Sequence, residues 1–189
     1  DRFGRLKELG AIVALTADHG MGDKADEDGN PNVIWLQDIL DAAVGEGACQ
    51  VICPITDAFV GHHGALGGFV RVYCKDGLDA DRVIEAIQGT PGIEKIMTAE
   101  TVCRELEQPR AREGDVAVLA DKVTVIGTRE VEHDLSGLKG HRLRTHGSLH
   151  ETHVPFVISE SLTDQYAERG LAGGLRSHEI FDFALNGPA

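Results

Sequence analysis

One short stretch constrains the fold of this chain more than any other: an apolar run followed directly by Asp18 and His19. The run covers residues 11–17, and residues 11–16 are expected to form a buried strand of a parallel sheet. The Gly-Met-Gly at 20–22 lets the backbone turn sharply behind them. Ligands of open α/β sheets bind at the carboxyl ends of strands, and Asp and His are zinc donors. The stretch indicates either half of a metal site or a polar turn capped by Asp18.

Charge and hydropathy narrow the classes of partner. The 189 residues carry 18 Lys and Arg against 31 Asp and Glu, a formal net charge of −13. We therefore expect no nucleic-acid or membrane partner. There is no apolar run long enough for a membrane span and no basic-then-apolar leader, so a cytoplasmic location is expected. The four cysteines form no Cys-x-x-Cys pair and are expected to be buried thiols: Cys49, Cys53, Cys74 and Cys103.

An acidic, turn-rich segment separates the first motif from the next apolar pattern. Residues 22–32 are expected to form an exposed loop. A calcium loop is the alternative, but the glutamate at the twelfth position of an EF-hand is missing. Asn32 is expected to cap a helix over 33–44, because Leu36, Ile39 and other apolar residues fall on one face.

The pattern turns β-rich after this helix. We expect a small α+β unit with open-faced sandwich character over roughly 48–120, interrupting a larger α/β domain. The expected strands are 50–53, 67–74, 93–97, 116–119 and 123–126, and the expected helices are 79–88 and 99–107. A free-standing ferredoxin-like binding module is the alternative for this unit. A buried strand at 154–159 and a final amphipathic helix capped by Ser177 complete the chain.

Four histidines gather late in the chain, and two more lie among glycines in its middle. His146 precedes Gly147 in a loop that runs into the 154–159 strand, a position suited to a metal ligand or to a plain surface residue. The other late histidines are His141, His150 and His153. His62 and His63 would lie in the small α+β unit, either near a substrate or in a structural turn.

Two of these motifs together resemble a known superfamily. Thr16-Ala17-Asp18-His19-Gly20-Met21 resembles the metal motif of the alkaline phosphatase superfamily. Thr145-His146-Gly147, followed by Glu151 and Val154-Pro155, resembles that superfamily's last histidine ligand. Residues 32–38 and 54–67 are similar to the phosphonoacetate hydrolase family within it. The likeness covers nearly the whole chain. It implies a partial alkaline-phosphatase-like α/β core, at 1–47 and 121–189, with an inserted α+β cap at 48–120.

The resemblance also implies a site with two zinc ions. Asp18 and His19 would bind the zinc that also holds the nucleophile, and His146 would bind the zinc that grips the phosphoryl oxygens. The family's other ligands and its threonine nucleophile match nothing in this chain. We therefore expect the carboxyl-terminal half of such an enzyme, with no catalytic nucleophile of its own. Lys122 and Lys139 are either cations for the leaving group or solvated surface charges.

The activity implied by the resemblance is hydrolysis of the carbon–phosphorus bond of phosphonoacetate. Acetate and phosphate would form through a phosphothreonine intermediate whose nucleophile lies outside this chain. Two alternatives remain open: a phosphodiesterase or nucleotide pyrophosphatase of the same superfamily, and a non-catalytic metal-binding fragment. The expected partner is a small phosphonate, with a homodimer as one possible assembly. Manganese or iron would also suit Asp and His donors.

Overall fold

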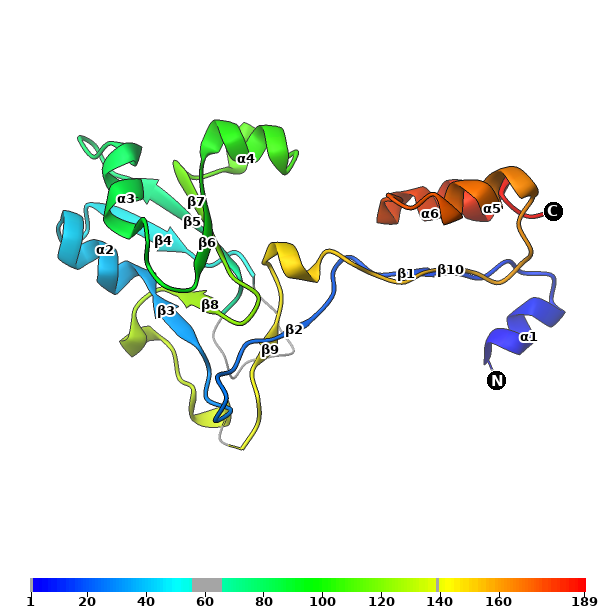
Figure 1. Ribbon diagram of the computed structural model, residues 1–189, viewed down its shortest axis with the longest axis horizontal. Helices are drawn as coiled ribbons and strands as arrows, with labels where there is room; N and C mark the ends of the chain where they lie inside the picture. Colours follow the sequence, from blue (N-terminus) through cyan, green and yellow to red (C-terminus); the bar gives the residue numbers. More distant parts are fainter. Residues whose placement is uncertain (1, 56–65, 139) are drawn as a thin grey trace. The chain divides into compact units, whose positions relative to one another are not determined.

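The computed structural model of the chain (Figure 1) describes residues 2–55, 66–138 and 140–189. The chain divides into two compact units. Unit 1 consists of residues 1–20 and 153–189, and unit 2 of residues 21–152. This division does not coincide with the expected core and cap, and that assignment stays a prediction.

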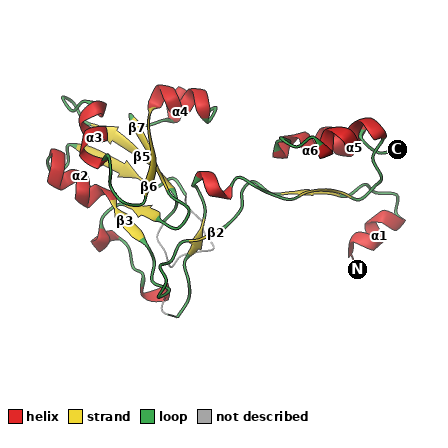
Figure 2. Cartoon of the chain, viewed as in Figure 1, coloured by secondary structure: helices red, strands yellow, loops and turns green. Residues whose placement is uncertain are grey.

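Unit 2 is built on a four-stranded antiparallel sheet in the order β4-β5-β7-β6 (Figures 1 and 2). Its strands are β4 (Cys49–Ile52), β5 (Phe69–Cys74), β6 (Ile93–Thr98) and β7 (Val116–Ala120). They lie where the sequence predicts strands. The runs are rich in β-branched residues, which fit the pleated surface of a sheet.

Helices cover one face of this sheet and the β6–β7 half of the other. α2 (Leu36–Val44) and α3 (Ala80–Ile87) pack over one face, where Val116 and Val118 belong to the largest core cluster. α4 (Ala99–Glu105) packs over the other face, against Ala117 and Leu119. All five residues of β7 are buried for this reason. The expected open-faced sandwich therefore holds for half of the sheet: α4 covers β6 and β7, while Gln50 and Ile52 of β4 and Tyr73 of β5 stay exposed on the same face.

Two further strand pairs complete the β-structure described in unit 2. β2 (Gly22–Asp23) pairs with β9 (Arg144–Thr145) in antiparallel fashion, and β3 (Val33–Trp35) pairs with β8 (Val125–Gly127) in parallel. The short 3-10 helices are η1 (Arg110–Arg112), η2 (Glu130–Glu132), η3 (Ser136–Leu138) and η4 (Leu149–Glu151).

The expected helix over 33–44 is wrong in its first turn. Residues 33–35 form β3, and the helix begins at Leu36. Asn32 does not cap it: the Asn32 amide donates to Thr124 Oγ1 at 2.9 Å. Pairing with the distant strand β8 overrides the helical periodicity, because β-branched residues favour a strand once a partner is present.

The acidic segment 22–32 is only partly an exposed loop. Gly22 and Asp23 form β2, and the Lys24 side chain is fully buried. Asp26 accepts from the backbone N–H of Asn30 at 2.8 Å, which closes the turn at the tip of the segment. The sequence expectation is therefore wrong for its first residues, which are held by pairing with β9.

Unit 1 contains one pair of short strands and several helices. β1 (Ala14–Thr16) pairs with β10 (Phe156–Ile158), and the helices are α1 (Arg2–Glu8), α5 (Asp164–Leu171), η5 (Ser177–Glu179) and α6 (Ile180–Asn186). Phe183 is 1% exposed and forms the centre of its core, with edge-to-face contacts to Phe156 and Tyr166.

Three expectations for unit 1 are wrong. β1 and β10 are not buried, since Leu15 and Val157 are each 50% exposed. They are antiparallel to each other, where a parallel sheet was expected. The final helix begins at Ile180, with Glu179 at its N-cap, and Ser177 opens the preceding 3-10 turn instead. Among the described residues, no helix is long and apolar enough to cross a bilayer.

Candidate metal centre

Asp18 and His19 lie just beyond β1, and their side chains are close enough to share a cation. The distance between Asp18 Oδ2 and His19 Nε2 is 3.6 Å. His19 Nδ1 lies 2.8 Å from the carbonyl oxygen of Gly20, a contact that orients the imidazole ring. Asp18 is 87% exposed at its side chain. A carboxylate oxygen and an imidazole nitrogen are both donor types that zinc accepts, and binding of a zinc ion by this pair stays a prediction.

The segment that carries His146 is fixed by its backbone and neighbours. The carbonyl of His146 accepts from the N–H of Gly68 at 2.8 Å, and Thr145 Oγ1 donates to the carbonyl of Leu66 at 2.9 Å. The approach at Gly68 requires a glycine, since a Cβ there would lie 2.5 Å from the Ser148 nitrogen. The half-buried His146 is therefore held where β9 ends.

A capping box follows His146 directly. Glu151 Oε2 accepts from the Ser148 N–H at 2.9 Å and from the Ser148 hydroxyl at 2.8 Å, which fixes the first turn of η4. Burial alone would raise the pKa of the Glu151 carboxyl. The buried Lys24 ammonium and Ser148 outweigh that effect and hold the pKa below its ordinary value.

The three predicted zinc ligands are divided between the two units. Asp18 and His19 belong to unit 1, and His146 belongs to unit 2. The structure brings the first two together and fixes the third in its own unit. That all three share a pair of cations stays a prediction. Within either unit, no three His, Cys, Asp or Glu side chains of the described residues form a metal-binding group.

The other histidines have varied surroundings. His150 Nε2 lies 2.6 Å from Glu94 Oε2, which ties η4 to the start of β6. His153 and His141 are exposed. His62 and His63, which the sequence places in the cap, lie outside the described residues, and so does Lys139.

Lys122 and Asp23 are two further charged residues of unit 2 whose surroundings the structure describes. Lys122 is exposed, as a surface charge would be, and its carbonyl accepts from Lys24 Nζ at 2.9 Å. Asp23 forms an ion pair with Arg142 at 2.7 Å. The hydrogen bond from Arg142 holds the pKa of the Asp23 carboxyl below its ordinary value.

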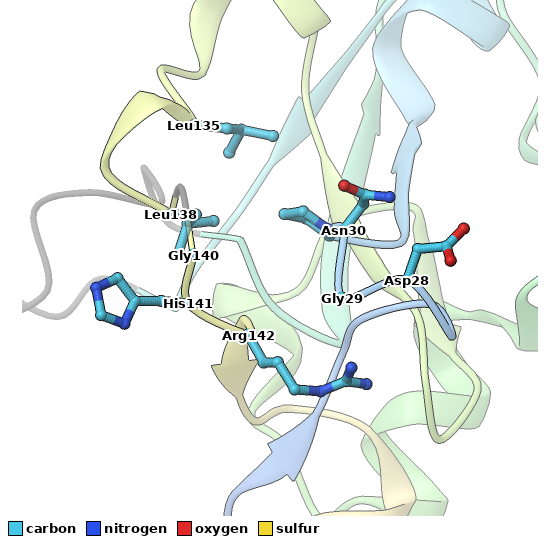
Figure 3. A pocket seen from close by; sticks show the side chains of 9 residues that line it. Asp28, Gly29, Asn30, Leu135, Leu138, Gly140, His141 and Arg142 are labelled. Carbon is cyan, nitrogen blue, oxygen red and sulfur yellow. The ribbon is translucent and has the colours of Figure 1, made fainter.

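A pocket of about 540 Å³ lies between the acidic segment and the chain leading to β9 (Figure 3). Figure 3 shows His141 and Arg142 extending away from each other at its lower rim. Arg142 also donates to the carbonyl of Asp26 at 3.1 Å. The pocket's arginine is thus engaged with the acidic segment.

Lys24 is the residue near the site that sequence reasoning missed. Its side chain is 0% exposed and pairs with Glu151 at 2.9 Å. The sequence offers one signal: Lys24 is the single basic residue of the acidic segment 22–32. In a loop of that composition the usual interpretation is a solvated charge, and burial depends on residues more than 90 positions away.

Comparison with solved structures extends these observations. No family model matches the chain. Phosphonoacetate hydrolase from Sinorhizobium meliloti 1021, solved in complex with phosphonoacetate and with phosphonoformate, is 37% identical to this chain with a TM-score of 0.82. The match covers 99% of this chain and 44% of that one, so this chain spans less than half of the hydrolase's length.

A second, more distant likeness concerns the fold alone. Murine ectonucleotide pyrophosphatase/phosphodiesterase 5 is 20% identical, with a TM-score of 0.56, over 85% of this chain and 38% of that one. Together the two likenesses show a mixed α/β protein whose fold is similar to part of an alkaline-phosphatase-like core. In sequence the chain is similar to phosphonoacetate hydrolase, as its motifs predict.

Proposed function

We propose that this chain forms part of a zinc-dependent phosphonoacetate hydrolase and supplies three of its metal ligands. The reaction breaks the carbon–phosphorus bond of phosphonoacetate by water and gives acetate and phosphate. A threonine outside this chain is the nucleophile, and a phosphothreonine is the covalent intermediate. The observation that carries the proposal is the 37% identity to the S. meliloti enzyme over 99% of this chain.

In the proposed site, Asp18 and His19 hold one zinc ion and His146 the other. The His19 imidazole is oriented by the carbonyl of Gly20, which favours a single donor nitrogen. When bound, the two ions neutralise the phosphonate charge and lower the pKa of the nucleophilic hydroxyl. The departing carbon keeps the bonding electrons, and the adjoining carboxylate spreads their charge.

We also propose a cytoplasmic location. All four cysteines are free thiols in the structure, and burial raises the pKa of Cys53 and of Cys74 to about 11. Such protonated thiols fit a reducing compartment.

The alternative activity from the same superfamily is cleavage of a phosphodiester or pyrophosphate bond instead of a carbon–phosphorus bond. A phosphodiesterase or nucleotide pyrophosphatase would use the same metal ligands, and only the leaving-group pocket would differ. The likeness to the murine phosphodiesterase, at 20% identity, supports the fold and not this activity. A non-catalytic metal-binding fragment is what we propose for the 189 residues in isolation, since they supply no nucleophile.

The test compares two substrates. Phosphate release from phosphonoacetate and nitrophenol release from a nitrophenyl phosphodiester are measured for the protein that joins this chain to the segment encoded upstream of Asp1. We expect phosphonoacetate to be preferred, with at least a hundredfold loss in His146→Ala. The exposed His178 is the matched control, and His178→Ala should keep the rate. Preference for the diester would favour the alternative, and full activity of His146→Ala would exclude the proposed ligand.

A further inference from the structure

Lys24 is the largest fully buried side chain of the chain's described residues, and it is charged. Its ammonium lies 2.9 Å from Glu151 Oε1, and the Glu151 side chain is 3% exposed. The same nitrogen donates to the carbonyl of Lys122 at 2.9 Å. It also donates to the carbonyl of Asp121 and the hydroxyl of Ser148, each at 3.4 Å. A buried ammonium is stable only with such a set of partners.

These contacts hold the His146 segment from both sides. Before His146, the backbone N–H of Lys24 donates to the carbonyl of Leu143 at 2.9 Å, beside the β2–β9 pair (Figure 1). After His146, the Lys24 side chain fixes the Glu151 carboxylate, whose other oxygen accepts from Ser148. One residue therefore fixes the position of the chain on either side of the predicted ligand.

Lys24 also links this segment to the sheet. Asp121 and Lys122, whose carbonyls accept from Lys24, form the turn between β7 and β8. Gly22 packs so closely over the pair that a Cβ there would lie 2.5 Å from Glu151 Oε1. The ion pair thus joins β2, the η4 turn and the end of a buried strand in one rigid arrangement.

Stability alone gives little reason for a charge at this position. Apolar side chains of similar volume commonly replace a buried ion pair with no loss of stability, because they avoid the desolvation of both charges. What an apolar pair cannot supply is the direction of the hydrogen bonds that Ser148 donates to Glu151. A zinc ligand needs that directional support, since the groups around a ligand set its orientation.

We propose that Lys24 is a positioning residue: through Glu151 and Ser148 it fixes the segment that presents His146 to its metal ion. The inference rests on the proposed function for the role of His146 as a ligand. It adds the residue that holds this ligand in place and the route through which it acts.

The test uses the 189-residue chain with Lys24→Met, which removes the charge and keeps a long side chain. The matched control is Arg71→Met. Arg71, which is 18% exposed, pairs at 2.7 Å with Glu113, which is 1% exposed, in a partly buried ion pair of unit 2 built from other residues. The readout is the imidazole ¹⁵N–¹H spectrum, in which the His146 signals are identified by their loss in His146→Ala.

We expect the His146 signals to broaden or split in Lys24→Met and to keep their positions in Arg71→Met. The double variant Lys24→Met/Glu151→Leu removes both charges and should fold at least as well as the single variant. Its His146 signals should stay perturbed, because Ser148 has lost its carboxylate. Unchanged signals in Lys24→Met, equal changes in Arg71→Met, or recovery in the double variant would overturn the proposal.

Measurements of zinc affinity distinguish the positioning role of Lys24 from the proposed role of His146 as a zinc ligand. Competition with a chromophoric chelator, on the protein that joins this chain to the segment that supplies the remaining ligands, should show about 10- to 100-fold weaker binding in Lys24→Met and little change in Arg71→Met. Equal affinity of Lys24→Met and the unmodified chain would overturn the positioning role toward zinc. Equal affinity of the unmodified chain and His146→Ala would instead exclude His146 as a ligand, and the imidazole spectrum would still decide whether Lys24 positions it.

Discussion

The two units of this chain differ in how far they bury strands of similar apolar sequence. In unit 2, Val118 on β7 is fully buried, because α2 and α3 pack over its face of the sheet. In unit 1, Val157 on β10 is 50% exposed, because its only described strand partner is β1. Both strands consist of consecutive apolar residues. The difference shows that burial depends on the layers around a strand, which its own sequence does not reveal.

The largest expected effect comes from placing a charge on each strand. Val118→Asp buries a carboxylate with no partner, and we expect a loss of about 4–5 kcal/mol or more, enough to unfold unit 2. Val157→Asp should cost under about 1 kcal/mol, since its carboxylate reaches water. Urea unfolding followed by circular dichroism measures both. Similar losses in the two variants would contradict the comparison.

A second substitution tests whether unit 1 has a core of its own. Phe183→Ala removes the ring that contacts Phe156 and Tyr166, and we expect a loss of about 3–5 kcal/mol confined to unit 1. Phe181, two residues earlier on α6, is 71% exposed, so Phe181→Ala should cost under about 0.5 kcal/mol. Amide hydrogen exchange resolves the two units. Protection lost equally in unit 2 would show that the units unfold together.

The exposed apolar residues of unit 1 predict self-association of the chain. Ile12, Leu15 and Val157 are 45%, 50% and 50% exposed, and β1 offers an open edge to another strand. We expect the Leu15→Lys/Val157→Lys variant to associate about tenfold more weakly, as measured by sedimentation velocity. An unmodified chain that is already a monodisperse monomer would contradict this prediction and the half-enzyme interpretation with it.

The smallest effect is a difference in acid sensitivity between two carboxylates. The pKa of Glu151 is held below its usual 4.5, so its contribution to stability is present above that pH and is lost as the pH falls through the lowered value. At acid pH the free energy of unfolding falls as Glu151 becomes protonated. Glu151→Gln should reduce the slope of this acid limb by up to about 1.4 kcal/mol per pH unit.

The matched control for this experiment lies in unit 1. Asn186, Arg169 and Tyr166 lower the pKa of Asp182, but this carboxylate is exposed to solvent, which screens the interaction. Asp182→Asn should therefore leave the acid limb nearly unchanged in urea unfolding between pH 3 and 6. An equal flattening by both variants would show that burial does not strengthen the Glu151 ion pair.

The sequence alone determined the class of this protein and most elements of unit 2. The Asp18-His19 and His146 motifs, with residues 32–38 and 54–67, indicated a likeness to phosphonoacetate hydrolase, which the comparison with its solved structure confirms. The strands and helices between 49 and 120 follow from local periodicity, and they were found within a few residues. Local signals suffice there because each element pairs with neighbours that are also predicted.

Only the tertiary structure decided which residues are buried and which partners they have. Residues 33–35 form a strand because they pair with β8. The Lys24 side chain is buried in an ion pair with Glu151, which lies 127 positions later in the sequence. The apolar strand at 14–16 stayed exposed for want of a covering layer. In each case the deciding contact lies far away in sequence, and a local pattern carries no information about it.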